Sequence, residues 1–138
     1  MALVPDGILE TALYVRDLDS AERFYGGTLG LEKIVRVEGR HVFFRCGDGI
    51  LLLFIASETV RPPSNPALPV PAHGMRGAGH ACFRVESDKM EPWRQHLEEE
   101  GVGIEADFRW PNGARSIYFR DPAGNSLEIA EPKLWDLE

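Results

Sequence analysis

The sequence predicts an α+β protein in which one βαβββ module occurs twice in tandem. Two segments with alternating apolar and polar residues, ILETALYV (8–15) and GHACFRVE (79–86), have the pattern of half-buried strands. Each is followed by polar residues that can cap a helix, a short amphipathic segment and three further strand-like segments. The two halves also share a hairpin turn, FRCGDG (44–49) in the first and FRDPAG (119–124) in the second.

One helix is expected in each half, directly after the first strand. The first covers roughly residues 20–29. Asp17 and Asp19 can cap it, and Asp19 and Glu22 have the spacing of a capping box. The second covers roughly residues 91–100 and carries Pro92. This proline must lie in the first turn, where a missing N–H group costs little.

The other strands follow each helix. They are expected at residues 32–37, 41–45 and 50–56 in the first half and at residues 103–109, 114–120 and 126–130 in the second. Module 1 therefore covers residues 8–58 and module 2 residues 79–131, within a single domain of residues 1–138. Residues 59–78, between the modules, hold five of the ten prolines and are expected to form a linker or a long loop.

Composition excludes several classes of function. The chain has 138 residues, 43% hydrophobic and 27% charged, as expected of a globular protein that folds without disulfides. Its net charge of −7, with no basic block, disfavours nucleic acid as a partner. No apolar run is long enough to cross a membrane, and the start of the chain lacks the features of a secretory signal, so we expect a cytoplasmic protein. Cys46 and Cys82 have no CxxC spacing and indicate neither a zinc knuckle nor a disulfide framework.

Three segments carry a family resemblance: TALYVRDLDSAERFYGGTLGLEK (11–33), GAGHACFRVE (77–86) and SIYFRDPAGNSLEIAEP (116–132). Together they resemble the vicinal oxygen chelate superfamily, which includes glyoxalases, fosfomycin and bleomycin resistance proteins, extradiol dioxygenases and methylmalonyl-CoA epimerases. The resemblance implies the fold of that superfamily, in which paired βαβββ modules form a cup of curved sheets. It also implies a metal ion on the inner face of the cup.

The resemblance implies three metal ligands in this chain. His80 and Glu128 match the histidine and the glutamate that the family places on the first and last strands of the second module. Glu10 stands where the family usually has a histidine. Some members have a fourth ligand on the last strand of the first module, and aligning the two hairpins puts Leu53 there, which cannot bind a metal.

Strand alternation, independently of the resemblance, puts Glu10, His80 and Glu128 on the faces turned away from the helices. Leu51, Leu53 and Ile55 are expected to share that apolar surface, where an ionised carboxylate is costly unless it is paired or bound to a metal. Two carboxylates and one imidazole favour Mn²⁺, Fe²⁺ or Mg²⁺, and affinity alone also admits Ni²⁺, Cu²⁺ and Zn²⁺.

Each predicted ligand also has a structural interpretation. Glu10 could be a solvated strand end, His80 a hydrogen-bonded core histidine, and Glu128 the partner of Arg84.

Other residues are candidates for contact with a substrate. Tyr14 and Arg84 are expected to line the cup, and His73 could lean over its mouth from the proline-rich segment. Arg109, Trp110 and Asn112 precede the last hairpin and could contact an anionic or aromatic ligand, but a surface turn is favoured. His41 is expected to face solvent.

The main hypothesis is a metal-dependent enzyme, a lyase, isomerase or dioxygenase, that acts on a small oxygenated organic molecule bound to the metal through two neighbouring oxygens. The alternative is a metal-free protein that binds a small molecule or antibiotic, as bleomycin resistance proteins do. A scaffold that reuses the fold is a third possibility. Exposed sheet edges and the family's habit favour a homodimer, and the site could be built within one chain or across two.

Overall fold

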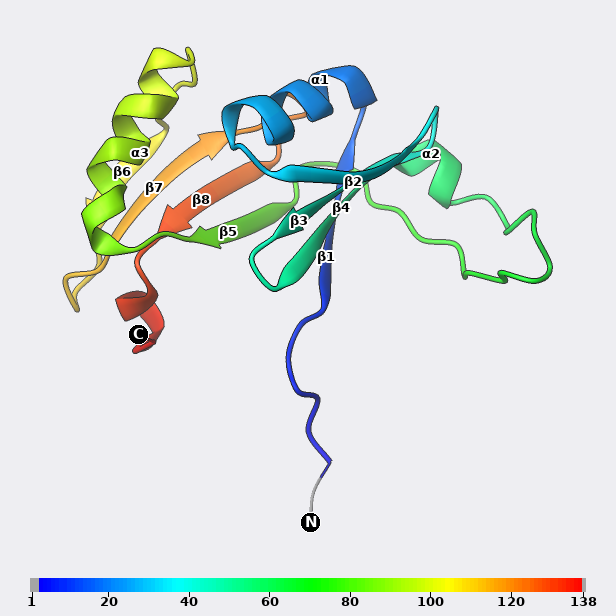
Figure 1. Ribbon diagram of the computed structural model, residues 1–138, viewed down its shortest axis with the longest axis horizontal. Helices are drawn as coiled ribbons and strands as arrows, with labels where there is room; N and C mark the ends of the chain where they lie inside the picture. The colour runs from blue at the N-terminus through cyan, green and yellow to red at the C-terminus, as the bar shows by residue number, and fades with distance from the viewer. Residues whose placement is uncertain (1–2, 138) are drawn as a thin grey trace. The chain divides into compact units, whose positions relative to one another are not determined.

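The chain forms two compact units, residues 1–76 and residues 77–138, in a computed structural model that describes residues 3–137. The boundary lies inside the predicted linker. Unit 1 holds a four-stranded sheet in the order β1 (Glu10–Val15), β4 (Gly49–Ile55), β3 (His41–Cys46), β2 (Glu32–Val37). Unit 2 repeats that order with β5 (His80–Arg84), β8 (Ser126–Ala130), β7 (Arg115–Arg120), β6 (Ala106–Arg109) (Figure 1). In both, the first strand is parallel to the last and the rest are antiparallel, which confirms the tandem βαβββ prediction.

The helix of unit 1 begins earlier than expected and changes from an α-helix to a π-helix partway along. Asp17, not Asp19, is its N-cap, and the Asp17 carboxylate accepts from the backbone N–H of Asp19 at 3.1 Å. Helix α1 (Leu18–Glu22) then continues into a π-helical segment, η1 (Arg23–Thr28). There the Leu29 N–H donates to the Phe24 carbonyl, five residues back, at 2.9 Å.

The helix of unit 2, α3 (Ser87–Glu99), also begins about one turn earlier than predicted. Pro92 therefore lies in the second turn, and the expectation of a first-turn proline is wrong. The carbonyl that loses its donor belongs to Asp88, which is exposed, so water can solvate it. Met90 and Leu97 form the buried stripe of the helix.

Each sheet buries the face that carries the helix. In unit 1 this core includes Leu13, Val15, Val42, Phe44 and Leu53; in unit 2 it includes Leu97, Ile117, Phe119, Leu127 and Ile129. Leu13 stands directly opposite Leu53 in the parallel ladder of β1 and β4, so the two side chains share the helix-facing side. The expectation that Leu51, Leu53 and Ile55 lie on the face of Glu10 is therefore wrong. All residues from Leu51 to Phe54 are apolar. Without alternation between apolar and polar residues, the sequence does not show which of them face the helix.

Two short helices lie outside the βαβββ pattern. Helix α2 (Ala56–Thr59) follows β4, and residues 60–79 then continue without helix or strand. A 3₁₀-helical turn, η2 (Pro132–Trp135), follows β8. None of the helices formed by residues 3–137 has the length and apolar character needed to span a membrane.

Ion pairs connect α3 to its sheet. Arg115 on β7 donates through two nitrogens to Asp107 on β6, at 2.8 and 2.7 Å, and Arg94 on α3 donates to the same carboxylate. Arg115 also reaches Glu91 on α3 at 2.8 Å. These hydrogen bonds, above all those from Arg115, lower the pKa of Asp107 to about 2.

Asp107→Asn is therefore expected to destabilise the protein by about 1–2 kcal/mol at pH 7. The folded-state pKa lies below the ordinary value, so the stabilisation is fully present above about pH 4 and is lost as the pH falls toward 2. Urea unfolding at pH 7 and pH 3 measures the difference, with the exposed Glu99→Gln as control. An Asp107→Asn deficit that is the same at both pH values would contradict the assignment.

Candidate functional site

A cavity of about 570 Å³ lies within unit 2. Its lining comes from the three strands β5, β7 and β8 and from the segments that follow β6 and β8: His80, Cys82, Trp110, Pro111, Asn112, Tyr118, Glu128, Leu134 and Trp135. The register of the strands explains why three of these side chains lie together. Glu128 stands opposite Cys82 on one side and opposite Tyr118 on the other, so the three form one row across the sheet. His80 lies two residues before Cys82 on the same face.

His80 has its tautomer determined by the backbone. Its Nδ1 lies 2.9 Å from the carbonyl oxygen of Ser126, and because a carbonyl only accepts, Nδ1 carries the proton. In the neutral ring, Nε2 then presents a lone pair. That atom lies 3.4 Å from Oε1 of Glu128. Two electron-rich atoms therefore face each other, an arrangement that a proton or a metal cation between them stabilises.

Glu128 is a buried carboxylate with only 5% of its side chain exposed. Its other oxygen, Oε2, accepts from the hydroxyl of Ser116 at 2.5 Å. Ser116, which is fully buried, in turn accepts from Nε1 of Trp110 at 2.8 Å. This chain of hydrogen bonds fixes the carboxylate and leaves Oε1 directed toward His80.

The two neighbours of Glu128 in its row stay neutral. Burial, and then hydrogen bonding to Glu128 and its charge, raise the pKa of the Tyr118 hydroxyl to about 12. Although Cys82 is accessible, desolvation by the cavity wall and then the Glu128 charge raise the pKa of its thiol to about 12. A thiol that stays protonated suits packing rather than nucleophilic attack.

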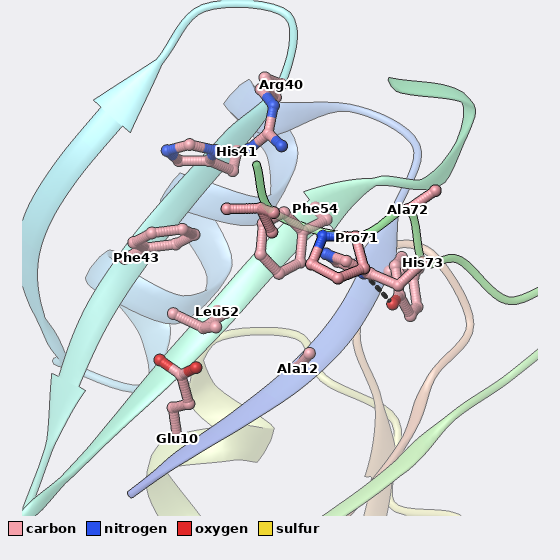
Figure 2. Close-up of a pocket in the computed structure, with 12 residues that line it drawn as sticks. Glu10, Ala12, Arg40, His41, Phe43, Leu52, Phe54, Pro71, Ala72 and His73 are labelled. Carbon is pink, nitrogen blue, oxygen red and sulfur yellow. Dashed lines mark hydrogen bonds between the residues drawn. The ribbon is translucent and has the colours of Figure 1, made fainter. Parts of the chain in front are cut away.

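A second cavity, of about 730 Å³, lies within unit 1 (Figure 2). Strand β1 contributes Glu10, Ala12 and Tyr14; Leu52 and Phe54 come from β4; His41 and Phe43 come from β3; Arg40 and the segment Val70–His73 complete the lining. The predicted alternation of β1 is thus confirmed for the cavity face. The Tyr14 hydroxyl lies 2.6 Å from Nδ1 of His73, and the His73 N–H donates to the Thr59 carbonyl at 2.9 Å. These two hydrogen bonds hold His73, at the end of the proline-rich segment, against β1 and helix α2.

The two cavities occupy equivalent positions in their units. Glu10 stands opposite Ile50, two residues before the pair Ala12–Leu52, just as His80 stands opposite Ser126, two residues before the pair Cys82–Glu128. Glu10 therefore holds the place of His80. The place of Glu128 falls to Leu52, so the expectation that Leu53 takes that fourth position is wrong by one residue. Leucine still cannot bind a metal.

The predicted site residues divide between the units. His80 and Glu128 lie together in unit 2, and Glu10, Tyr14 and His73 line the cavity of unit 1. Arg84 lines neither cavity and instead pairs with Glu86 at 3.1 Å. Within either unit, the described residues form no group of three His, Cys, Asp or Glu side chains that could hold a metal ion.

For two residues of the cavities, the sequence favoured another role. For Trp110 a surface turn was favoured over contact with a ligand, but it lines the cavity and donates a hydrogen bond to Ser116. His41 was expected to face solvent, yet it is half-buried and stacks on Phe43 with ring centres 4.1 Å apart. Burial, and then the charge of Arg40, lower the pKa of His41. The alternation of β3 could have placed His41 and Phe43 on one face. The cavity that they line also needs the segment Val70–His73, which is distant in sequence.

A family model described as the Glyoxalase/Bleomycin resistance protein/Dioxygenase superfamily matches residues 7–129. The chain belongs to this superfamily. The match spans both βαβββ units and confirms the resemblance on which the ligand assignment was based. Members of the superfamily among solved structures and curated proteins give a finer comparison.

The solved structure of lactoylglutathione lyase from Agrobacterium tumefaciens is similar, with a TM-score of 0.92 and 46% identity over 96% of this chain and 98% of that chain. The fosfomycin resistance protein FosX from Mesorhizobium loti shares the fold, with a TM-score of 0.65 and 19% identity over 93% of each chain. The metallothiol transferase FosB from Staphylococcus saprophyticus is 36% identical over 58 residues, which are 41% of this chain and 38% of that protein.

Proposed function

We propose that this protein is a metal-dependent enzyme of the superfamily that acts on a small oxygenated organic molecule. Glu10, His80 and Glu128 would hold a divalent ion, to which the substrate binds through two neighbouring oxygens. Of the three reaction types, a lyase is favoured over an isomerase or a dioxygenase. The reason is the 46% identity to lactoylglutathione lyase, which extends over nearly the full length of both chains.

The observation that carries the proposal is the pairing of His80 with Glu128. The proton on Nδ1 leaves Nε2 free as a ligand atom, and Oε1 of Glu128 lies 3.4 Å from it. Two ligand atoms that each lie about 2.0–2.2 Å from one ion are themselves about 3.0–3.5 Å apart. The Ser126 carbonyl and the Ser116 hydroxyl supply the outer hydrogen bonds that metal-binding imidazoles and carboxylates usually have.

The chain's own residues have distinct tasks in this proposal. An ion bound here would act as a Lewis acid that polarises the oxygens of the substrate. The Tyr118 hydroxyl, whose raised pKa keeps it protonated, hydrogen-bonds to the Glu128 carboxylate and would help to hold that ligand in place. Glu10 would complete the ligand set from the start of β1, because it holds the position in unit 1 that His80 holds in unit 2.

Metal content tests the proposal directly. We expect about one transition-metal ion per chain when the protein is purified without a histidine tag and measured by elemental mass spectrometry. His80→Asn and Glu10→Gln are each expected to lower the bound metal, because each removes one ligand. A wild-type protein that binds no ion after incubation with Mn²⁺, Fe²⁺, Ni²⁺, Zn²⁺ and Mg²⁺ would contradict the proposal.

That contrary result would favour the second candidate, a metal-free protein that binds a small molecule. Two observations support this alternative. The position equivalent to Glu128 in unit 1 is Leu52, and the unit 1 cavity is lined largely by apolar and aromatic side chains. Such a cavity can hold a ligand by shape and apolar contact alone.

We further propose a homodimer. β1 and β5 are edge strands of the sheets that residues 3–137 form, and unpaired strand edges favour association. Light scattering after size-exclusion chromatography is expected to give twice the chain mass of 15.4 kDa. A mass of 15.4 kDa at micromolar concentration would contradict the dimer and would require all three ligands to come from one chain.

A further inference from the structure

We propose that the unit 1 cavity binds a planar, conjugated molecule that carries an anionic group, with the guanidinium of Arg40 as its anchor. The cavity lies entirely within residues 1–76, so this binding does not depend on the metal pair of unit 2. As a statement about the substrate class of the enzyme, it rests on the proposed function. As a statement about a binding site, it stands alone.

The shape of the cavity is set by rings arranged around Phe54. His41, Phe43 and His73 each lie edge-on to the Phe54 ring, with ring centres 5.7, 5.4 and 4.7 Å away and interplanar angles of 75–78°. Strand register brings these rings together, because His41 stands opposite Phe54, and Phe43 opposite Leu52. Figure 2 shows the Phe54 ring between Phe43 and His73. Such a set favours a flat, polarisable ligand that can stack or meet ring edges.

The charge of the cavity is asymmetric. Arg40 is half-buried at one end, and within residues 3–137 no carboxylate forms an ion pair with its guanidinium. One of its nitrogens donates to Nδ1 of His41 at 2.8 Å, and the group lies over the Phe54 ring, 5.9 Å from its centre. A guanidinium has five N–H donors, so others remain for an anionic ligand. Beside aromatic rings, where water is partly excluded, such a contact is stronger than in bulk solvent.

His41 supports this polarity. Because Arg40 donates to Nδ1, the neutral imidazole carries its proton on Nε2, which adds a second donor near the same end of the cavity. Burial and the Arg40 charge both favour this neutral form. The only acidic group of the lining, Glu10, lies at the opposite end (Figure 2).

The spacing of the two ends limits the ligand. Glu10 and Tyr14 are four residues apart on β1, or about 13 Å at about 3.3 Å per residue, and Tyr14 stands opposite Phe54. A ligand anchored at Arg40 and stacked near Phe54 would therefore point its far end toward Glu10. If Glu10 binds the ion, the reactive oxygens of the substrate belong at that far end, away from the anionic group.

Binding of three matched probes tests the inference. 2-Naphthoate is planar and anionic, 2-naphthalenemethanol is planar and neutral, and cyclohexanecarboxylate is anionic without a planar ring. Isothermal titration of the full-length protein is expected to give the tightest binding for 2-naphthoate. Arg40→Met, which keeps an unbranched side chain over Phe54 but removes the charge, is expected to weaken 2-naphthoate about tenfold or more. It should leave 2-naphthalenemethanol within about twofold.

Control variants distinguish binding in this cavity from binding elsewhere on the protein. Arg61→Met removes an exposed arginine that pairs with Glu58 outside the cavity, and it should leave 2-naphthoate binding unchanged. Glu128→Gln should also leave it unchanged, because that residue lies in unit 2. Thermal melting checks that each variant is folded.

Three results would overturn the inference: no binding of 2-naphthoate to the wild type, equal binding to Arg40→Met, or cyclohexanecarboxylate binding as tightly as 2-naphthoate. Loss of 2-naphthoate binding in Glu128→Gln would show that the probe binds a metal ion instead, and would also overturn it. If the purified protein contains the metal ion but does not bind 2-naphthoate, this inference is rejected and the proposed function stands. If the protein binds 2-naphthoate but no metal ion, the proposed metal site is rejected and the unit 1 binding site stands.

Discussion

Glu128→Gln is expected to weaken divalent metal binding by 100-fold or more without destabilising the metal-free protein. Glutamine keeps the shape of the side chain and can still accept the hydrogen bond from Ser116. It loses the negative charge that faces Nε2 of His80 and would balance the charge of the ion, and a 100-fold loss of affinity corresponds to about 2.7 kcal/mol. In the absence of a cation the same charge is a burden, because the side chain is 5% exposed.

Titration with Mn²⁺ or Zn²⁺ followed by calorimetry measures the affinity, and the melting temperature with and without metal provides a second measure. Ion at 100 times its Kd is expected to stabilise the wild type by about 2.7 kcal/mol and the variant far less. Glu131→Gln is the matched control, because Glu131 is also buried, three residues further along, but faces Arg109 at 3.7 Å. Equal affinities for wild type and Glu128→Gln would exclude Glu128 as a ligand.

Ser116→Ala is expected to weaken metal binding by about 10- to 100-fold, although Ser116 would not touch the ion. Its hydroxyl holds Oε2 of Glu128 at 2.5 Å, and alanine removes this contact while leaving the Trp110 N–H without its acceptor. Glu128 can then turn away from His80, so part of the binding energy is lost to ordering the carboxylate. Trp110→Phe removes only the donor behind Ser116, and a loss of less than about tenfold is expected.

A neighbouring serine provides the control for this effect. Ser126 contributes its backbone carbonyl to His80, and Ser126→Ala keeps that carbonyl, so its metal affinity should match that of the wild type. A merely structural role for Ser116 would lower the melting temperature of the metal-free protein without changing the Kd of the ion. That result would contradict the positioning role.

Much of the fold could be predicted because its signals are local. Strands β2 and β8 match their expected bounds, and the others differ by at most three residues at either end. The predicted starts of both helices were too late. In unit 1 the start depends on a single capping residue, Asp17, and in unit 2 a proline is tolerated in the second turn because the carbonyl that it leaves without a donor is exposed. The apolar run of β4 could not be assigned to faces, because both of its faces are apolar.

The candidate site was predicted less completely. Alternation correctly placed Tyr14 on the same face of β1 as Glu10, and His80 on the face of Glu128. The same reasoning expected Arg84 to line the cup, but its guanidinium turns to Glu86 instead. Ser116 and Arg40 gave no signal in the sequence, since serine in a strand and arginine in a turn are ordinary.

The sequence by itself determined the repeated βαβββ units, the faces of β1 and β5, and the superfamily resemblance, because strand period and turn chemistry depend only on near neighbours. The tertiary structure alone decided which side chains share a row: Leu52 rather than Leu53 opposite Ala12, and Tyr118 opposite Glu128. It also decided the direction of the hydrogen bonds that set the His80 tautomer and the Glu128 carboxylate. Register and hydrogen-bond direction join residues 10 to 46 positions apart, so they depend on how strands meet and not on the order of residues along any one strand.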